Sequence, residues 1–224
     1  MNTGKLIVID GGDGAGKQTQ TDMIVRRLIE EGHPVGTLGF PRYEANTFGK
    51  LLRECLDGKR GDFLNMDAQI ASTLYAADRF ESKPTIEKWL EEGRIIILDR
   101  YVSSNMLHQG SKIHDPKELE TFLEWLDTIE HSIFKMPRPD LILYCDVHPE
   151  QRVKLLAYGD GKRKNAMDLA DTNLQHQKET DEAAKQVIEK MNNWVSINCM
   201  GNDGQICPRE DIHENIYNAV KEII

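Results

Sequence analysis

Residues 11–19 read Gly11-Gly12-Asp13-Gly14-Ala15-Gly16-Lys17-Gln18-Thr19 and directly follow an apolar run at residues 5–9. An apolar run, a glycine-rich loop and a helix-forming segment in this order are typical of a phosphate-binding strand, loop and helix. The glycines let backbone N–H groups point inward, the helix N-terminus adds partial positive charge, and Lys17 can reach the outer phosphates of a nucleotide. We therefore expect this whole stretch to bind a nucleoside triphosphate. The alternative is a glycine-rich turn without a ligand.

One position of the loop departs from the strict pattern. That pattern has Ser or Thr directly after the lysine, because the hydroxyl helps to hold magnesium, and this chain has Gln18 there. Thr19 is the nearest hydroxyl and becomes the candidate magnesium ligand of the loop.

The apolar runs predict the fold class. Those at 6–9, 95–98 and 141–145 lack polar alternation, as do parallel strands that are covered on both faces, and shorter runs at 35–40 and 195–199 are expected to join them. Helical patterns occupy 19–31, 68–92, 116–134, a segment from 149, 168–194 and a segment from 209. This alternation predicts an α/β fold, a doubly wound parallel sheet of about five strands flanked by helices. We expect one domain over 1–224, with a small lid at 159–167.

Composition excludes several classes of partner. The 28 Lys and Arg residues against 37 Asp and Glu residues give a net charge of -9, which argues against general affinity for nucleic acid or for an anionic membrane. We see no signal-peptide pattern and no run of membrane-spanning length, so cytoplasmic residence is the default expectation. The four cysteines lack CxxC spacing and are expected to be reduced thiols rather than zinc ligands.

Charged residues directly follow the apolar run at 95–98. In open parallel sheets, ligands gather at the carboxyl ends of the strands, and Asp99 and Arg100 lie at such an end. A carboxylate that can hold magnesium and a guanidinium beside a phosphate loop fit phosphoryl transfer. A solvated ion pair at a strand end is the alternative.

At this point the chain resembles the thymidylate kinase family of P-loop nucleoside monophosphate kinases. The resemblance rests on 11–20, on Phe40-Pro41-Arg42, on residues 74–79, and on Asp99-Arg100-Tyr101 with Ser104-Asn105 and Gln109-Gly110. It implies a homodimeric enzyme that uses Mg2+ and transfers the γ-phosphate of ATP to dTMP to give dTDP. A deoxynucleoside kinase on the same fold, or a catalytically weak nucleotide-binding regulatory module suggested by Gln18, are the competing interpretations.

The resemblance also implies roles for individual residues. Tyr75 would stack on thymine, and Arg79, one helical turn further on, would donate to a thymine carbonyl, although periodicity alone also allows Tyr75 to be a core residue. His108 stands where the family often has tyrosine. The implied catalytic residues are Lys17, Arg100, Asp99 and Asp13, and the implied magnesium ligands are Thr19, Asp99 and Asp13. Arg163 of the lid would reach the ATP phosphates. The implied substrate-binding residues are Phe40, Arg42, Tyr43, Tyr75, Arg79, Arg100, Asn105, His108 and Gln109.

Overall fold

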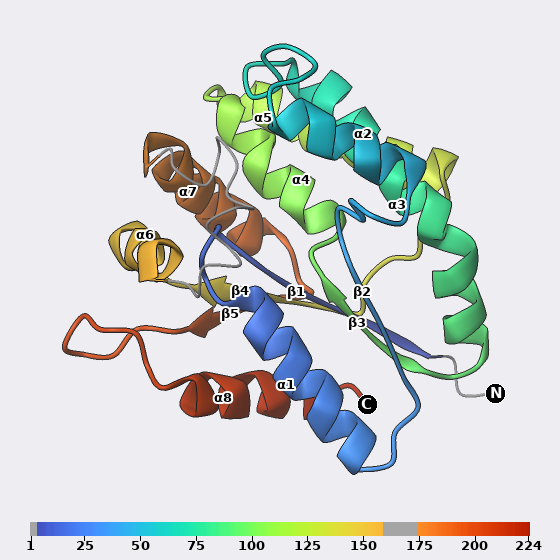
Figure 1. Ribbon diagram of the computed structural model, residues 1–224, viewed down its shortest axis with the longest axis vertical. Helices are drawn as coiled ribbons and strands as arrows, with labels where there is room; N and C mark the ends of the chain where they lie inside the picture. Colours follow the sequence, from blue (N-terminus) through green and yellow to red (C-terminus); the bar gives the residue numbers. More distant parts are fainter. Residues whose placement is uncertain (1–3, 159–173) are drawn as a thin grey trace.

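A computed structural model describes residues 4–158 and 174–224, and Figure 1 shows their arrangement around one central sheet. The sheet has five parallel strands in the order β2-β3-β1-β4-β5. The chain therefore builds one side of the sheet first and then crosses to the other side of β1. The predicted doubly wound parallel sheet is confirmed, with strands β1 (Lys5–Gly11), β2 (Val35–Gly39), β3 (Ile95–Asp99), β4 (Leu141–Asp146) and β5 (Trp194–Asn198).

The central strand explains why its sequence is continuously apolar. β1 pairs with β3 on one edge and with β4 on the other, so that Ile7 lies opposite both Ile97 and Leu141. Successive side chains of a strand point to opposite faces, and Ile7 and Val8 accordingly belong to two different hydrophobic clusters. Both faces are buried, so no position along residues 6–9 favours a polar residue.

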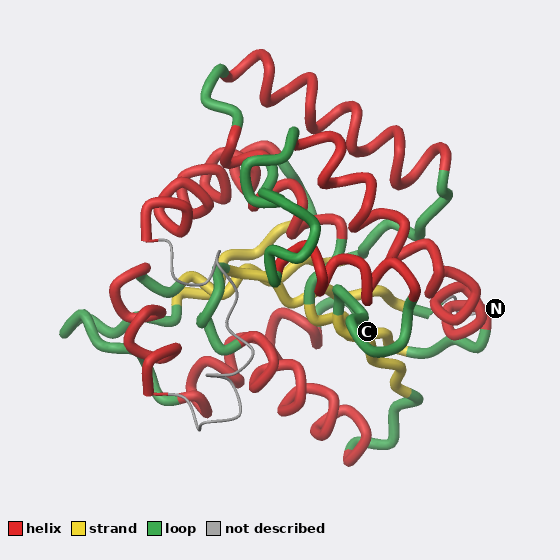
Figure 2. The backbone as a smooth tube through the Cα atoms, turned by 45° about the horizontal axis from the view of Figure 1, so that its top comes forward, coloured by secondary structure: helices red, strands yellow, loops and turns green. Residues whose placement is uncertain are grey.

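Helices cover the two faces of the sheet, as Figures 1 and 2 show. On one face, α1 (Lys17–Glu30) and α8 (Arg209–Lys221) supply Ile24, Leu28, Ile212 and Ile216 to a common core. The core on the other face comes from α3 (Ala68–Glu91), α4 (Val102–His108), α5 (Pro116–Asp127) and α7 (Leu174–Lys190). The remaining helices are α2 (Thr47–Leu56), which packs on α3, α6 (Pro149–Tyr158), and the short 3-10 helix η1 (Gly110–Lys112).

The structure differs from the sequence-based ranges in several places. Helices α2 and α4 were not expected, and the predicted helix at 116–134 is α5 followed by a π-helix, η2 (Thr128–Ile133). Helix α7 ends at Lys190 because the chain turns into β5 at Trp194. The expected lid at 159–167 and the expected start of that helix at 168 lie outside the described residues. Within the described part of the chain, no helix has the length and apolar character that crossing a membrane requires.

A close approach between β2 and α3 yields a test of this packing. A Cβ atom at Gly36 would lie 2.4 Å from Cε3 of Trp89, whereas one at Gly39 on the same strand would meet its nearest neighbour, the Cβ of Asp99, at 3.7 Å. We expect Gly36→Ala to lower the free energy of unfolding by about 1–3 kcal/mol because the indole must move. The matched variant Gly39→Ala should stay within about 0.5 kcal/mol of the wild type. Urea denaturation measures both, and equal effects would contradict the proposed contact.

Candidate active site

The loop between β1 and α1 has a backbone that only glycines adopt readily. Gly11, Gly14 and Gly16 have φ angles of 146°, 82° and 81°. Gly12 is restricted in another way, because a Cβ there would lie 2.0 Å from Nη1 of Arg152. The glycines therefore permit both the turn of the loop and the close packing of α6 behind it.

Lys17, the first residue of α1, folds its side chain back over the loop. Its ammonium group donates to the carbonyl oxygens of Gly11 and Gly12 at 2.9 and 2.7 Å, and the side chain is buried. Burial lowers the pKa of Lys17 from its ordinary value and the nearby charge of Arg100 lowers it further, against the opposing effect of Asp13, Asp99 and Asp10. The loop thus holds a cation at the place where a nucleotide phosphate needs one.

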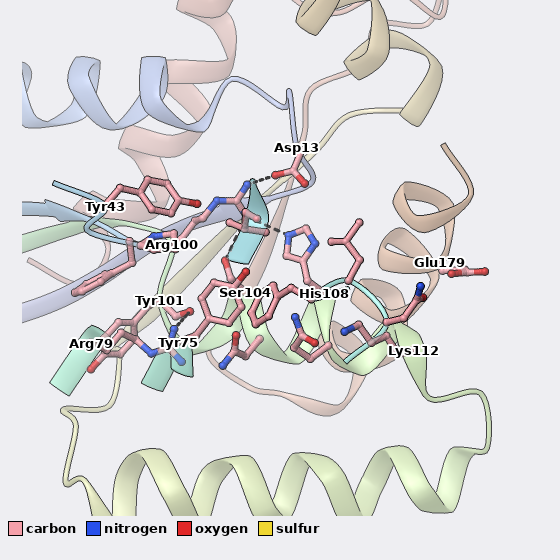
Figure 3. A pocket seen from close by; sticks show the side chains of 18 residues that line it. Asp13, Tyr43, Tyr75, Arg79, Arg100, Tyr101, Ser104, His108, Lys112 and Glu179 are labelled. Atoms are coloured by element: carbon pink, nitrogen blue, oxygen red, sulfur yellow. Dashed lines mark hydrogen bonds and ion pairs between the residues drawn. The ribbon is translucent and has the colours of Figure 1, made fainter. Parts of the chain in front are cut away.

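Arg100 and Asp13 form an ion pair across the site, as Figure 3 shows. Arg100 directly follows β3 with a φ of 67°, and its backbone N–H donates to the carbonyl of Ile9 at 3.0 Å. Its Nη2 contacts a carboxylate oxygen of Asp13, and its Nη1 lies 3.1 Å from Nε2 of His108, which accepts because a guanidinium can only donate. This ion pair connects the carboxyl end of β3 to the glycine-rich loop.

The charges of this pair are mutually stabilised. Burial by itself raises the pKa of Asp13, but the charges of Arg100 and Lys17 outweigh it and hold that pKa well below its usual range. Burial disfavours the charge of Arg100 in the same way, yet the carboxylates of Asp13, Asp10 and Asp99 raise its pKa above the ordinary value. Both groups therefore stay ionised at neutral pH.

Asp10 is an important residue that the sequence analysis did not select. Its completely buried carboxylate accepts hydrogen bonds from the N–H of Gly11 at 2.9 Å, from Oγ of Ser103 at 2.6 Å and from Oγ of Ser104 at 2.9 Å. The available signal was an acidic residue at the end of a continuously apolar strand, directly before the loop. Asp10 fixes the start of α4 relative to the start of the loop.

A cavity of about 250 Å³ opens beside the ion pair. It lies between the residues that follow β2, helix α3 and helix α4, and Asp13 brings the glycine-rich loop to its edge. The structure brings together here all of the expected substrate-binding residues except Arg42: Phe40, Tyr43, Tyr75, Arg79, Arg100, Asn105, His108 and Gln109. The other lining residues are Pro41, Leu56, Phe63, Leu64, Asn65, Tyr101, Ser104, Lys112 and Glu179.

The apolar end of the cavity is aromatic. The ring of Tyr75 lies against that of Phe63, with centroids 5.9 Å apart. Arg79, one turn further along α3, lines the cavity although its side chain is almost fully buried, and it pairs with Glu130 of η2. Asn105 on α4 donates from Nδ2 to the carbonyl of Ser72 at 3.2 Å. An aromatic face next to hydrogen-bonding side chains can bind a planar base.

Arg42 lies outside the residues that line the cavity. Its Nη1 donates to Oγ of Ser82 at 3.2 Å, and its backbone N–H donates to Oδ2 of Asp78 at 3.0 Å. Oδ1 of Asp78 also accepts from Nδ2 of Asn46 at 2.9 Å. Burial raises the pKa of Asp78, while the hydrogen bonds from Arg42 and Asn46 and the charge of Arg79 oppose this shift. Asp78 thus ties the segment after β2 to α3, a role that the sequence did not indicate.

The candidate magnesium ligands do not form a closed cage. Gln18 is exposed and donates from Nε2 to Asp22 at 2.9 Å, while Thr19 is half-buried. Among the described residues, no group of three or more His, Cys, Asp or Glu side chains could hold a metal ion. Hydroxyl and carboxylate oxygens from Thr19, Asp13 and Asp99 nevertheless fit Mg2+, which is often held by one or two carboxylates together with nucleotide phosphates. Arg163 lies outside the described residues.

Comparisons with known proteins agree with this geometry. The family model for thymidylate kinase matches residues 9–205. The chain is 34% identical to the thymidylate kinase of Mycobacterium tuberculosis over 135 residues, which cover 60% of this chain and 62% of that protein, so the match spans less than two thirds of the relative's length. It is 32% identical to the human thymidylate kinase over 162 residues, or 72% of this chain and 70% of the human one.

A solved structure of thymidylate kinase from Candida albicans has a similar fold. The TM-score is 0.76 at 23% identity, and the superposition covers 98% of this chain and 92% of the Candida chain. The likeness thus extends over nearly the whole fold, including the parallel sheet and the helices that position the loop and the cavity. Because the family model spans most of the sequence and includes the loop, the ion pair and the cavity residues, the chain belongs to the thymidylate kinase family.

Proposed function

We propose that this protein transfers the γ-phosphate of ATP to the 5'-phosphate of dTMP, giving dTDP and ADP. One observation carries the proposal: a cavity with an aromatic, hydrogen-bonding end reaches the glycine-rich loop through the Arg100–Asp13 pair. A pyrimidine at the far end would point its 5'-phosphate toward the loop, where the ATP phosphates bind.

Different residues of the site bind the donor phosphates and stabilise the group in transfer. The loop N–H groups and Lys17 hold the donor phosphates, and Arg100 stabilises the charge of the group in transfer. The acceptor oxygen belongs to a phosphate that is already ionised at neutral pH, so the reaction needs no general base. Mg2+, when bound with ATP, neutralises phosphate charge, and Thr19, Asp99 and Asp13 are the residues that would hold it.

On the acceptor side, we assign Tyr75 to stacking on thymine and Arg79 to a thymine carbonyl, with Asn105 and Gln109 at the polar edges. Arg42 would approach the acceptor phosphate by giving up its contact with Ser82. His108 and Tyr43 would flank the sugar and phosphate, because both line the cavity next to Arg100.

We also propose a cellular location and an oligomeric state for the protein. All four cysteines are free thiols, which supports a reducing, cytoplasmic location.

The proposed assembly is a homodimer formed through an apolar patch. The patch consists of Phe80 and Ile133, which are 47% and 60% exposed, and of Phe134, whose ring centroid lies 5.0 Å from that of Phe80. Exposed apolar side chains that cluster on one face are typical of an interface.

A substrate panel tests the reaction. With ATP and Mg2+, we expect ADP release with dTMP, weaker release with dUMP or dCMP, and none with free thymidine. Turnover with thymidine alone would instead indicate a deoxynucleoside kinase, and ATP binding without any turnover would indicate a regulatory module.

Lys17→Ala tests the donor site. Removing a cation that compensates charge in the transferring group should lower kcat by about 10²-fold or more. The free energy of unfolding should fall by about 2–4 kcal/mol, since two hydrogen bonds from a charged group to carbonyls are lost, and the variant should remain folded. Lys50→Ala, at an exposed position of α2, is the control and should leave both quantities unchanged. Full activity of Lys17→Ala would contradict the assignment.

The dimer is tested with Phe80→Glu. A charge in a buried apolar interface is costly, so light scattering after gel filtration should show a monomer, and circular dichroism should show unchanged helix content. Ile29→Glu is a matched control, because Ile29 is 57% exposed but lies on α1, on the opposite face of the sheet. A wild-type monomer, or dissociation by both variants, would rule out this interface.

A further inference from the structure

Glu130 is a fully buried acid behind the cavity, and the reaction proposed above makes no use of it. Its side chain is 0% exposed, and it pairs with Arg79, whose side chain is 3% exposed. Nε of Arg79 lies 3.1 Å from Oε1 and 3.3 Å from Oε2 of Glu130, and Nη2 contacts Oε1 as well. A buried charge requires a partner of opposite charge, and here each of the two side chains is the partner of the other.

This pair lies at the wall of the cavity. Arg79 lines the cavity, while Glu130 is absent from the lining and therefore contacts the guanidinium from behind. From another side, Nη1 of Arg79 donates to the backbone carbonyl of Tyr101 at 3.3 Å, as Figure 3 shows. A guanidinium has five N–H groups, and the described contacts leave one on each terminal nitrogen for a ligand.

The backbone that carries Glu130 departs from an ordinary helix. Helix α5 buries Leu119, Phe122 and Leu126 at helical spacing, and the same spacing continued would bury both Glu130 and Ile133. In the π-helical turn η2, Glu130 is fully buried, as this spacing predicts, but Ile133 is 60% exposed.

Two backbone hydrogen bonds hold this turn in place. The N–H of Phe134 donates to the carbonyl of Ile129 at 2.9 Å, and the N–H of Met136 donates to the carbonyl of Glu130 at 2.8 Å. Single π-helical turns occur frequently at functional sites. The local structure thus places a carboxylate, rather than an apolar side chain, behind Arg79.

We propose that Glu130 is a positioning residue for base selection: it acts through Arg79 and fixes the two remaining N–H groups toward the base. This inference rests on the proposed function, in which the base is thymine. A fixed guanidinium presents only donors, so it favours a pyrimidine with a carbonyl at position 4 and disfavours one with an amino group there. Without the carboxylate, the long side chain of Arg79 would lose its defined orientation.

Four proteins and two nucleotides test the inference. The variants are Glu130→Gln, Arg79→Gln and the double variant, compared with the wild type. The nucleotides are dTMP and 5-methyl-dCMP, which differ at the base edge because the second carries an amino group in place of the 4-carbonyl. Binding of each is measured by calorimetry, and kcat and KM are measured for each nucleotide and for ATP.

We expect Glu130→Gln to weaken dTMP binding and to raise its KM by about tenfold or more, as expected for the loss of hydrogen bonds to a charged group. The KM for ATP and the affinity for 5-methyl-dCMP should stay within about twofold, so selectivity between the two bases falls. In the Arg79→Gln background, the Glu130→Gln change should have no further effect on dTMP, because Glu130 acts through Arg79.

Control variants distinguish a role of Glu130 in positioning Arg79 from a role in folding. Glu120→Gln, at an exposed position of α5, should change nothing. Glu130→Asp keeps the charge on a shorter side chain and should give intermediate dTMP affinity, which also covers the case in which Glu130→Gln fails to fold. Unchanged base selectivity in folded Glu130→Gln or Glu130→Asp, or additive effects in the double variant, would overturn the inference and leave a structural role only.

The binding measurements also distinguish this inference from the proposed function. Wild-type protein that binds dTMP selectively but does not phosphorylate it would overturn the proposed reaction, and the effect of Glu130 would still be read from the dissociation constants. Wild-type protein that binds both nucleotides equally would overturn base selection by Glu130, even if it phosphorylates dTMP.

Discussion

Asp10, the penultimate residue of the central strand, has a carboxylate without access to solvent, and both sides of the candidate site take their positions from it. A buried carboxylate is tolerated only when hydrogen bonds replace those that water would make. Asp10 obtains them from the first N–H of the glycine-rich loop and from the hydroxyls of Ser103 and Ser104 at the start of α4. The loop and the helix that carries Asn105 and His108 are therefore held by one anion.

Charged side chains of both signs surround Asp10. Lys17 and Arg100 are the cations, and Asp10, Asp13 and Asp99 are the nearby anions that favour their charged forms. Charges placed in advance at a buried site need little rearrangement when a substrate binds, which is the main physical contribution a protein makes to phosphoryl transfer. The geometry of the β1 and β3 ends supplies this arrangement, because parallel strands bring their carboxyl ends to one edge of the sheet.

The sequence predicts the sheet and the loop well because both depend on local patterns. Continuous apolar runs indicated the buried parallel strands, and the glycine spacing indicated the loop. Helix α4 has only seven residues, too few for a clear periodic pattern, and was missed; α2 was missed although its buried residues recur at helical spacing. Asp10, Asp78 and Glu130 were missed for another reason: their partners Ser103, Arg42 and Arg79 lie 93, 36 and 51 residues away in sequence, and only the tertiary structure pairs them.

The order of the strands has a consequence for synthesis of the protein. β1 leaves the ribosome before the other strands, yet Lys5 pairs with Ile95 and Ile7 with Leu141, so neither edge of this apolar strand can be paired until much later parts of the chain have emerged. Such long-range pairing slows folding and leaves unpaired strand edges open to association in the meantime. The central strand of the folded protein is thus the one whose edges stay unpaired longest during synthesis.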